Sequence, residues 1–352
     1  MKILPLLICS LLLSACKTES PITPGKCQYT SLLHTDLVKL TNALPPAVTA
    51  ALTKDPTPEG ALGRNREAYF HVRFQLDIGF LASYAVQYES EEALNKFIKA
   101  VEYSYNYQKP AGDFELVIPE NLADQGQPAE GDLSSGIAFF TATLGHSLMQ
   151  LEQSTWFQNR TPDLLSERLA LLRPKIEKGL LYLLSQKEIL KIYDQNAPNR
   201  LLFDALAYYS LGTYLNNEEA KSVGIDFIEL ALAKQDELGY LIEGDGFDSS
   251  YNGVSLRLGI ILLGIVDPTD AIYTKLQQAI ICCASWQASR ILPTGEINTE
   301  GNTRVYPGGE DFLGEEKQVA WIDTLLSFYF MSYLTGQSTY LNLAERIKSY
   351  YE

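Results

Sequence analysis

The stretch Leu201-Leu-Phe-Asp-Ala-Leu-Ala-Tyr-Tyr-Ser-Leu-Gly-Thr-Tyr-Leu-Asn-Asn-Glu-Glu-Ala220 contains the unit from which the fold is built. Its first part, 201–215, is apolar and aromatic at helical spacing, and a second helical segment follows at 218–234. Asn216 and Asn217 alone separate the two segments. Two helices joined by so short a turn lie antiparallel, so the stretch predicts a helical hairpin.

Most of the chain repeats this pattern of paired helices, with short turns inside pairs and longer loops between them. A first helix or two, interrupted at Pro45-Pro46, is predicted within 31–52. The further predicted pairs are 65–88 with 91–107, 133–151 with 163–186, 251–265 with 270–290, and 315–334 with 338–351. Because no strand-rich region is present, the predicted class is all-α, with short hairpins or strands in the loops.

The loops between pairs are related to one another. Each has a turn, a short alternating apolar run, and an acid close to an amide or a second acid. The four loops carry Glu120-Asn121, Asp194-Gln-Asn196, Glu243-Gly-Asp245 and Glu300-Gly-Asn302. Self-similarity at a period of about 50–75 residues is typical of repeat architectures.

A second repeat places an aspartate in an apolar helical run at Asp77, Asp204 and Asp323. Arg73 and Arg200 precede the first two by four residues, so each arginine is predicted to meet its aspartate on one helix face. Ion pairs of this kind are more often structural than catalytic.

With these hairpins and loops the chain resembles the α/α toroids, in which an inner ring of helices is wrapped by an outer ring. The resemblance implies a single domain over 31–352, with a complete or incomplete ring. It also implies that the acid-bearing loops emerge at one end of the ring, where Asp77 and Asp204 would face the same cleft and bind substrate.

The first residues predict an export signal. Lys2 precedes an apolar run that is too short to span a bilayer, so residues 1–15 are expected to be a signal peptide. Leu13-Ser-Ala-Cys16 resembles the lipobox of bacterial lipoproteins, which implies cleavage before Cys16 and lipidation of its sulfur. Lys17 at the next position favours the outer membrane by the same resemblance. Residues 16–30 are predicted to be a lipidated, flexible tether.

Charge and cysteine content narrow the function classes. The formal net charge of −15 argues against a nucleic-acid partner, which needs a basic face. Cys282 and Cys283 lie in an apolar helical run and are predicted to be buried free thiols, with a Cys27 bridge to one of them left open. The absence of a CxxC motif and a total of three histidines argue against zinc. His146 is predicted to be a satisfied core histidine.

Two glycine-rich loops are predicted to form the functional cleft, at 239–253 and 295–311. In the first, Asp248, Ser249 and Ser250 are good N-caps for a helix beginning near Tyr251. The candidate catalytic residues are Glu243, Asp245, Asp248, Tyr251, Glu300 and Tyr306. The candidate substrate-binding residues on the second loop are Asn302, Arg304 and Glu310.

These residues suit three kinds of chemistry. In β-elimination from a uronic acid, Tyr251 or Tyr306 would act as base and acid with a pKa lowered by a cation, and Asn302 and Arg304 would neutralise the carboxylate. The segment Asp248-Ser-Ser-Tyr-Asn-Gly253 is similar to tyrosine-bearing segments of toroid lyases. In glycoside hydrolysis, two carboxylates among those on the two loops would react. The pair Asp245 and Asp248 could also hold calcium, although no cofactor is required.

The sequence therefore predicts a lipid-anchored, extracytoplasmic protein that acts on a poly- or oligosaccharide, as a polysaccharide lyase or a glycoside hydrolase. The alternative is a non-catalytic lipoprotein that binds glycans or has a structural role in the envelope.

Overall fold

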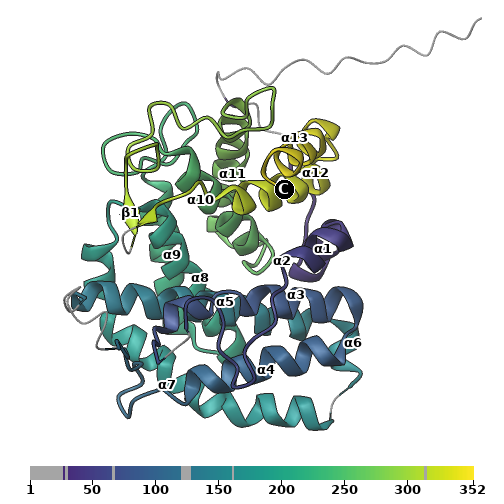
Figure 1. Ribbon diagram of the computed structural model, residues 1–352, viewed down its shortest axis with the longest axis vertical. Helices are drawn as coiled ribbons and strands as arrows, with labels where there is room; N and C mark the ends of the chain where they lie inside the picture. Colours follow the sequence, from purple (N-terminus) through teal and green to yellow (C-terminus); the bar gives the residue numbers. More distant parts are fainter. Residues whose placement is uncertain (1–26, 28–30, 66–67, 120–127, 161, 313–314) are drawn as a thin grey trace, which may run out of the picture.

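The computed structural model describes residues 27, 31–65, 68–119, 128–160, 162–312 and 315–352 (Figure 1). The predicted signal peptide, Cys16 and all of the tether except Cys27 lie outside the described residues, as do Glu120 and Asn121.

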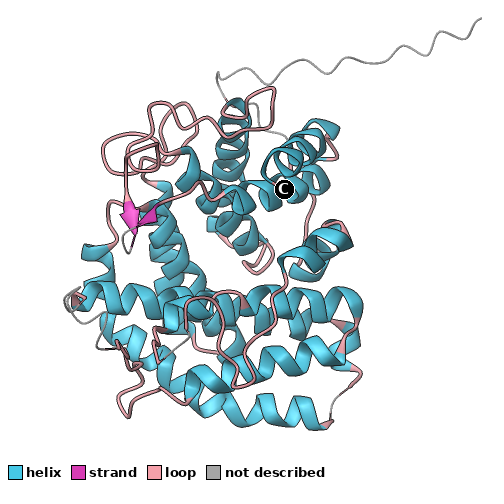
Figure 2. Ribbon diagram, viewed as in Figure 1, coloured by secondary structure: helices cyan, strands magenta, loops and turns pink. Residues whose placement is uncertain are grey.

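The described part of the chain is mostly helical, which confirms the all-α class (Figure 2). The two-residue strands β1 (Asp311–Phe312) and β2 (Glu315–Glu316) form a small antiparallel pair. The helices are α1 (Leu37–Ala43), α2 (Pro46–Leu52), α3 (Ile78–Tyr88), α4 (Glu91–Tyr105), α5 (Glu130–Gln153), α6 (Thr155–Gln158), α7 (Leu164–Tyr193), α8 (Pro198–Leu215), α9 (Glu218–Leu232), α10 (Ser249–Leu263), α11 (Ala271–Ser289), α12 (Trp321–Thr335) and α13 (Ser338–Tyr351).

The turns inside the pairs form where the sequence places them. Asn216 ends α8 in the left-handed conformation at φ 58°, and the Asn217 side chain then accepts a hydrogen bond from the Ala220 N–H at 2.9 Å to start α9. An asparagine tolerates the left-handed region and is also a favoured N-cap, so two residues suffice to reverse the chain. The turn between α12 and α13 uses Gly336 at φ 69° instead.

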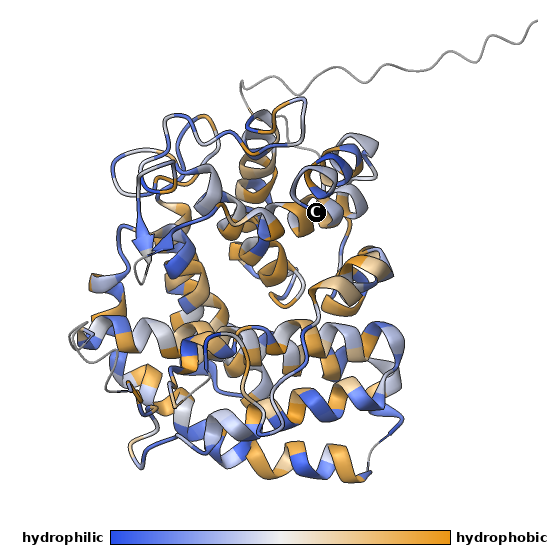
Figure 3. Cartoon of the chain, viewed as in Figure 1, coloured by the Kyte–Doolittle hydropathy of each residue, from blue (hydrophilic) through white to orange (hydrophobic). Residues whose placement is uncertain are grey.

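The hairpins pack side by side in chain order. Helices α3, α5, α8, α10 and α12 contact one another in succession, and α1 contacts both α12 and α3. Each of these five helices also contacts its own partner, namely α4, α7, α9, α11 or α13. Helices α5, α8, α10 and α12 are buried on most of their sides, as expected for helices enclosed by others. Helix α9 buries one face and exposes the other, and Figure 3 shows both hydrophobic and hydrophilic residues along it.

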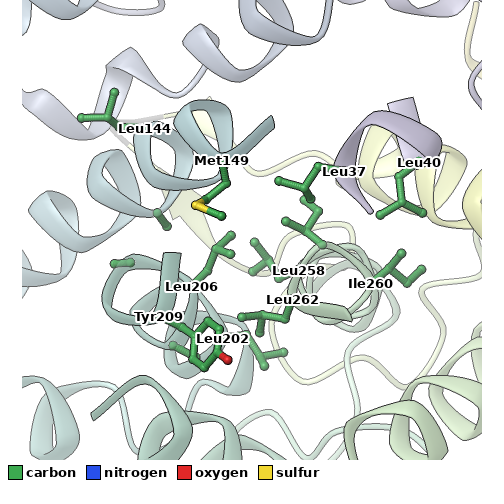
Figure 4. Packing of buried hydrophobic residues seen from close by; sticks show 14 of the residues in the cluster. Leu37, Leu40, Leu144, Met149, Leu202, Leu206, Tyr209, Leu258, Ile260 and Leu262 are labelled. Atoms are coloured by element: carbon green, nitrogen blue, oxygen red, sulfur yellow. The ribbon is translucent and has the colours of Figure 1, made fainter. Parts of the chain in front are cut away.

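The core lies where these enclosed helices meet. Figure 4 shows Leu37 of α1, Met149 of α5, Leu206 of α8 and Leu258 and Leu262 of α10 in one cluster. All five side chains are 8% exposed or less. Burying a side chain of this size contributes about 1.5–3 kcal/mol, so these contacts hold successive hairpins together. None of the helices among the described residues is long and apolar enough to cross a bilayer.

Three of the differences from the predicted helix boundaries have a clear structural reason. Helix α3 begins at Ile78 and not near 65, because the buried Gln75 side chain accepts from the Leu62 N–H at 2.6 Å and fixes a non-helical path. Helix α12 begins at Trp321 because 315–316 pair as β2. Helix α7 runs on to Tyr193, so the predicted loop at 187–193 is wrong: Leu190 is fully buried on a continuing helical face.

A glycine turn recurs along the chain and fixes the loops between hairpins. In each copy the glycine has φ between 97° and 114° and lies against a backbone carbonyl of a partner helix, where a Cβ atom would be closer than 3.0 Å to the oxygen. Only glycine fits such a position without strain. The four pairs of glycine and carbonyl residue are Gly60 with Lys99, Gly112 with Lys178, Gly239 with Cys282, and Gly295 with Arg346. The relation predicted for three of the loops is thereby confirmed, and Gly60 adds a fourth copy before α3.

Cys27 and Cys282 form a disulfide, so the prediction of a free thiol is wrong for Cys282 and confirmed for Cys283. Neighbouring helical residues point about 100° apart, which lets Cys282 face the N-terminal segment while Cys283 stays buried. The bond joins the start of the described chain to α11 across 255 residues of sequence.

Candidate functional site

The two glycine-rich loops lie against each other, as predicted. The Ser249 N–H donates to the Asn302 Oδ1 at 2.9 Å, and the Thr303 N–H donates to the Phe247 carbonyl at 3.0 Å. Both loops lie beside the N-terminal ends of α10 and α12, next to the β1–β2 pair (Figure 1). Side chains from 239–253 and 295–311 therefore share one region.

Asp248 and Asn302 hold this arrangement together. One carboxylate oxygen of Asp248 accepts from the Ser250 and Tyr251 N–H groups, both at 3.0 Å. The other accepts from the Arg304 and Val305 N–H groups at 3.1 and 2.8 Å. The side chain is 0% exposed, so these four bonds use its oxygens and assign it a structural role in place of the predicted catalytic one.

Asn302, predicted to bind substrate, is also structural. Its Oδ1 accepts from Ser249 and its Nδ2 donates to the Val305 carbonyl at 2.8 Å. Asp248 and Asn302 together fix where Arg304 leaves the backbone.

Arg304 joins two of the predicted carboxylates. Its Nη1 lies 2.5 Å from Glu243 Oε1 and its Nη2 lies 2.8 Å from Glu310 Oε1. Burial raises the pKa of Glu243 to about 7, against the opposing effect of Arg304. The pKa of Arg304 is itself raised by its anionic neighbours, so Glu243 is the member of the pair that titrates near neutrality. The pKa of Glu310 is lowered, because hydrogen bonds from Tyr251 and Arg304 and the charge of Lys317 outweigh its burial.

Tyr251 lies at the centre of these charges. Its hydroxyl donates to Glu310 Oε2 at 2.7 Å and accepts a hydrogen bond from the Lys317 ammonium. The Arg304 guanidinium lies 4.6 Å from the ring centroid, and Lys317 Nζ lies 4.4 Å from it. Burial nevertheless raises the pKa of Tyr251, and Arg304 only opposes this, so the expectation of a lowered pKa is wrong. Tyr251 is a phenol at neutral pH.

A second group of charges adjoins the first. Arg73 and Arg200 each lie 3.9 Å from the Asp132 carboxylate, and Arg200 Nη1 lies 3.2 Å from Asp194 Oδ1. The charge of Arg73 acts on Tyr251, and that of Arg200 acts on Glu243. Four cations (Arg73, Arg200, Arg304 and Lys317) thus gather in a strongly acidic chain.

The gathering of four cations changes the pKa of Lys317. Burial lowers its pKa, and the charges of Arg304, Arg73 and Arg200 add to that effect against the attraction of Glu310. A lysine whose pKa is lowered is a better proton acceptor near neutral pH than one in water.

The predicted pairing of Arg73 with Asp77 and of Arg200 with Asp204 is wrong. Asp77 precedes α3 and lies 3.8 Å from Lys54, while Arg73 is on the short 3₁₀ helix Val72–Gln75 and faces Asp132. Spacing by four residues brings side chains together only within one continuous α-helix, which Arg73 and Asp77 do not share. Arg200 and Asp204 do share α8, but the Arg200 guanidinium forms its ion pairs with Asp194 and Asp132.

Asp204 is fully buried, and neither carboxyl oxygen meets a hydrogen-bond donor among the described residues. Burial and the neighbouring Asp194 raise its pKa well above the usual range. We therefore take Asp204 as a neutral acid beside Asp194. It supports Asp194 and cannot touch a substrate.

Three further candidates lie away from the charge cluster. Asp245 and Glu300 are exposed on the loop surface, and Tyr306 is 42% exposed in a neighbouring groove. Sequence reasoning missed Lys317 and Asp132, because neither belongs to a motif. In the sequence Asp194 is one of the loop acids, and Arg73 and Arg200 fit structural ion pairs.

The remaining titratable candidates fit structural roles. His146 is buried, its Nδ1 lies 3.0 Å from the Ala142 carbonyl, and burial lowers its pKa to about 3, which confirms a core histidine. Among the described residues no three His, Cys, Asp or Glu side chains are arranged to hold a metal ion. The suggested calcium pair fails separately, because Asp248 already accepts four N–H bonds.

Comparisons with known proteins give no match: no family model, no curated protein and no solved structure is similar to this chain.

Proposed function

We propose that the hairpins form an α/α toroid with α3, α5, α8, α10 and α12 as the inner ring. The support is that α1 contacts both the first and the last of these helices and so links the ends of the series. The charge cluster lies at the N-terminal ends of the inner helices α5, α8, α10 and α12. Of these, α5, α8 and α12 have no side-chain cap, and such helix N-termini favour negative ligands.

The protein is proposed to be an extracytoplasmic lipoprotein anchored through Cys16. The lipobox-like Leu13–Cys16 supports this, and so does the Cys27–Cys282 disulfide, because such bonds persist in oxidising compartments. Labelling with radioactive palmitate in wild-type cells, compared with Cys16→Ala, tests the anchor. Equal label in both would exclude it.

For activity, we propose β-elimination at a uronic acid of a polysaccharide. The observation that carries this proposal is the Tyr251 hydroxyl, held between Lys317 and Glu310 beneath the Arg304 guanidinium. Tyr251 is a proton donor and Lys317 a proton acceptor, and the two are in direct contact. An elimination needs both, a base for the C5 proton and an acid for the leaving oxygen.

Each group then has one task. Lys317, as the neutral amine, takes the proton from C5 of the uronic acid, and the electron pair forms the C4=C5 double bond. The C4–O4 bond breaks, and Tyr251 gives its phenolic proton to O4. The proton on Lys317 then returns to Tyr251 through their hydrogen bond, which restores the site without water.

The uronic carboxylate needs cations, because removal of the C5 proton places negative charge on it. Arg73 and Arg200 are the proposed partners, since both guanidinium groups lie 3.9 Å from Asp132 and their charges act on Tyr251 and Glu243. Arginine binds carboxylates through two parallel N–H bonds, which also orients the sugar ring.

Hydrolysis is the second candidate. One observation favours it: Glu243 and Glu310 bind the same guanidinium, that of Arg304, but the pKa of Glu243 is raised and the pKa of Glu310 is lowered. A raised and a lowered carboxyl can serve as general acid and base.

A panel of acidic and neutral polysaccharides separates the candidates. Ultraviolet absorbance detects the C4=C5 double bond, and a reducing-sugar assay detects any cleavage. Both signals support elimination, and the second alone supports hydrolysis. Neither signal, together with glycan binding by calorimetry, would leave the non-catalytic binding protein as the answer.

Variants then test the roles. Tyr251→Phe and Lys317→Gln should each lower kcat at least about 100-fold, as expected when a proton-transfer group is removed. Tyr88→Phe, on an exposed tyrosine of α3, is the control. Activity needs Lys317 without its proton and Tyr251 with its proton. Because the pKa of Lys317 is lowered from 10.5 and that of Tyr251 is raised, kcat/KM should rise with pH, with an apparent pKa below 10.5. Full turnover in Tyr251→Phe would overturn the proposal.

A further inference from the structure

A groove adjoins the charge cluster at Lys317. It has a volume of about 400 Å³, and Lys317, which contacts Tyr251, lines it together with Trp321, Tyr350 and Tyr351. A second hollow of about 510 Å³ continues it past Tyr306. The two share Glu296, Thr299, Tyr306 and Pro307, so the two hollows adjoin each other.

One wall of the groove is aromatic. Trp321, at the start of α12, stacks on Tyr351 near the end of α13, with centroids 5.4 Å apart and planes 3° apart. Tyr351 in turn meets Tyr350 edge to face at 4.8 Å. Tyr350 is 46% exposed and Tyr306 is 42% exposed, so two of the large exposed aromatic side chains lie in this groove. The apolar face of a sugar ring packs on such surfaces, because rigid aromatic rings offer contact area at little entropic cost.

The charges of the groove differ from those of the cluster. Beyond Lys317 the lining includes Glu296 and Glu316, and the second hollow adds Glu300. The Glu316 side chain accepts from the Gly308 N–H at 2.9 Å and so is fixed on the rim. Carboxylates accept hydrogen bonds from sugar hydroxyls but repel a uronic acid.

We propose that this groove binds the neutral sugar residue that adjoins the cleaved uronic acid in the substrate. The substrate is then a glycan in which uronic acid and neutral or N-acetylated sugars alternate, and a chain of uronic acids alone is disfavoured. This inference rests on the proposed function, because it uses the same glycan chain to connect the cluster and the groove.

Binding is measured by isothermal titration calorimetry and by the fluorescence of Trp321. Three probes are used: a neutral N-acetylhexosamine trisaccharide, a uronic acid trisaccharide, and a tetrasaccharide that alternates the two sugars. All titrations are made on Tyr251→Phe protein, so that no probe is cleaved. A fluorescence change that is lost in the Trp321→Phe variant comes from Trp321 and not from Trp156 or Trp286.

The tetrasaccharide should bind more tightly than the uronic acid trisaccharide and should change the Trp321 fluorescence. Tyr350→Ala and Tyr306→Ala should each weaken its binding about tenfold, as expected when an exposed aromatic contact is truncated, and leave the uronic acid trisaccharide unaffected. Tyr88→Ala is the matched control, because Tyr88 has the same 42% exposure as Tyr306.

Failure of this inference is distinguishable from failure of the proposed function. If the groove variants bind all probes as the parent does, or if the uronic acid trisaccharide binds best and quenches Trp321, the groove proposal is overturned whatever the turnover. If the neutral trisaccharide binds with a Trp321 response and the groove variants abolish it, the groove is supported even where no polysaccharide is cleaved.

Discussion

Asp248→Asn is the most direct test of how the two loops are held. The change keeps shape and size but replaces one carboxylate oxygen with an NH₂ group. If the new amide keeps its oxygen on the Ser250 and Tyr251 N–H groups, its NH₂ group replaces Asp248 Oδ2. In the wild type this oxygen accepts from the Arg304 and Val305 N–H groups at 3.1 and 2.8 Å. Two hydrogen bonds become two donor–donor contacts.

The magnitude follows from those two bonds. A hydrogen bond to a charged group contributes about 1.5–3 kcal/mol, so losing two costs about 3–6 kcal/mol. Removal of a buried charge offsets part of this, because burial already raises the pKa of Asp248 against its four N–H bonds. We expect the free energy of unfolding to fall by about 3 kcal/mol.

The assay is equilibrium unfolding in urea at pH 7, followed by circular dichroism with the disulfide intact. Asp245→Asn is the control: it makes the same chemical change on an exposed side chain three residues earlier and should alter stability by less than about 0.5 kcal/mol. Hydrogen exchange of the peptide around 304–305 should also quicken in Asp248→Asn alone. If the two variants are equally stable, the carboxylate does not hold the loops.

Three other perturbations have defined outcomes. The pKa of Glu243 is about 7 in the folded state and 4.5 in the unfolded chain. Between these pH values the folded state binds a proton at Glu243 that the unfolded state has lost, so stability falls as the pH rises from 4.5 to 7. Wild type should lose about 2–3 kcal/mol relative to Glu243→Gln between pH 4.5 and 7.5 in urea titrations, and a constant difference would contradict the assignment. Reduction of Cys27–Cys282 should lower the free energy of unfolding by about 3–5 kcal/mol, since the bond closes a very long loop; an unchanged urea midpoint would mean that it constrains little. Gly295→Ala should lower the melting temperature well beyond Gly244→Ala, because both glycines have positive φ but Gly295 alone of the two would also strike a backbone carbonyl; equal shifts would show that only backbone strain matters.

The hairpins were predictable because their turns are made by local residues. Asn216, Asn217 and Gly336 favour reversal by their own backbone and side-chain preferences, whatever surrounds them. The non-helical path that ends in the short 3₁₀ helix Val72–Gln75 was not predictable, because Gln75 bonds to the backbone of Leu62 and Gly60, which only the folded chain brings near. A long-range hydrogen bond of this kind cannot be inferred from the periodicity of the sequence.

The candidate site was predictable as a region but not residue by residue. Asp245 and Asp248 share one glycine-rich stretch and look alike in sequence, yet one is exposed and the other accepts bonds from residues 56 and 57 positions away. Lys317 joins Tyr251 across 66 positions without any motif. Roles that depend on such distant partners are decided by the fold.

The disulfide also decides how a pull on the N-terminus enters the molecule. Tension applied upstream of residue 27 would pass through Cys282 into α11, and α1 lies outside that path. Helix α1 contacts α3 and α12, the first and last helices of the series, so its loss would remove its contacts to both. With the bond formed, we expect tension on the N-terminus to reach α11 before α1; with the bond reduced, we expect it to reach α1 first.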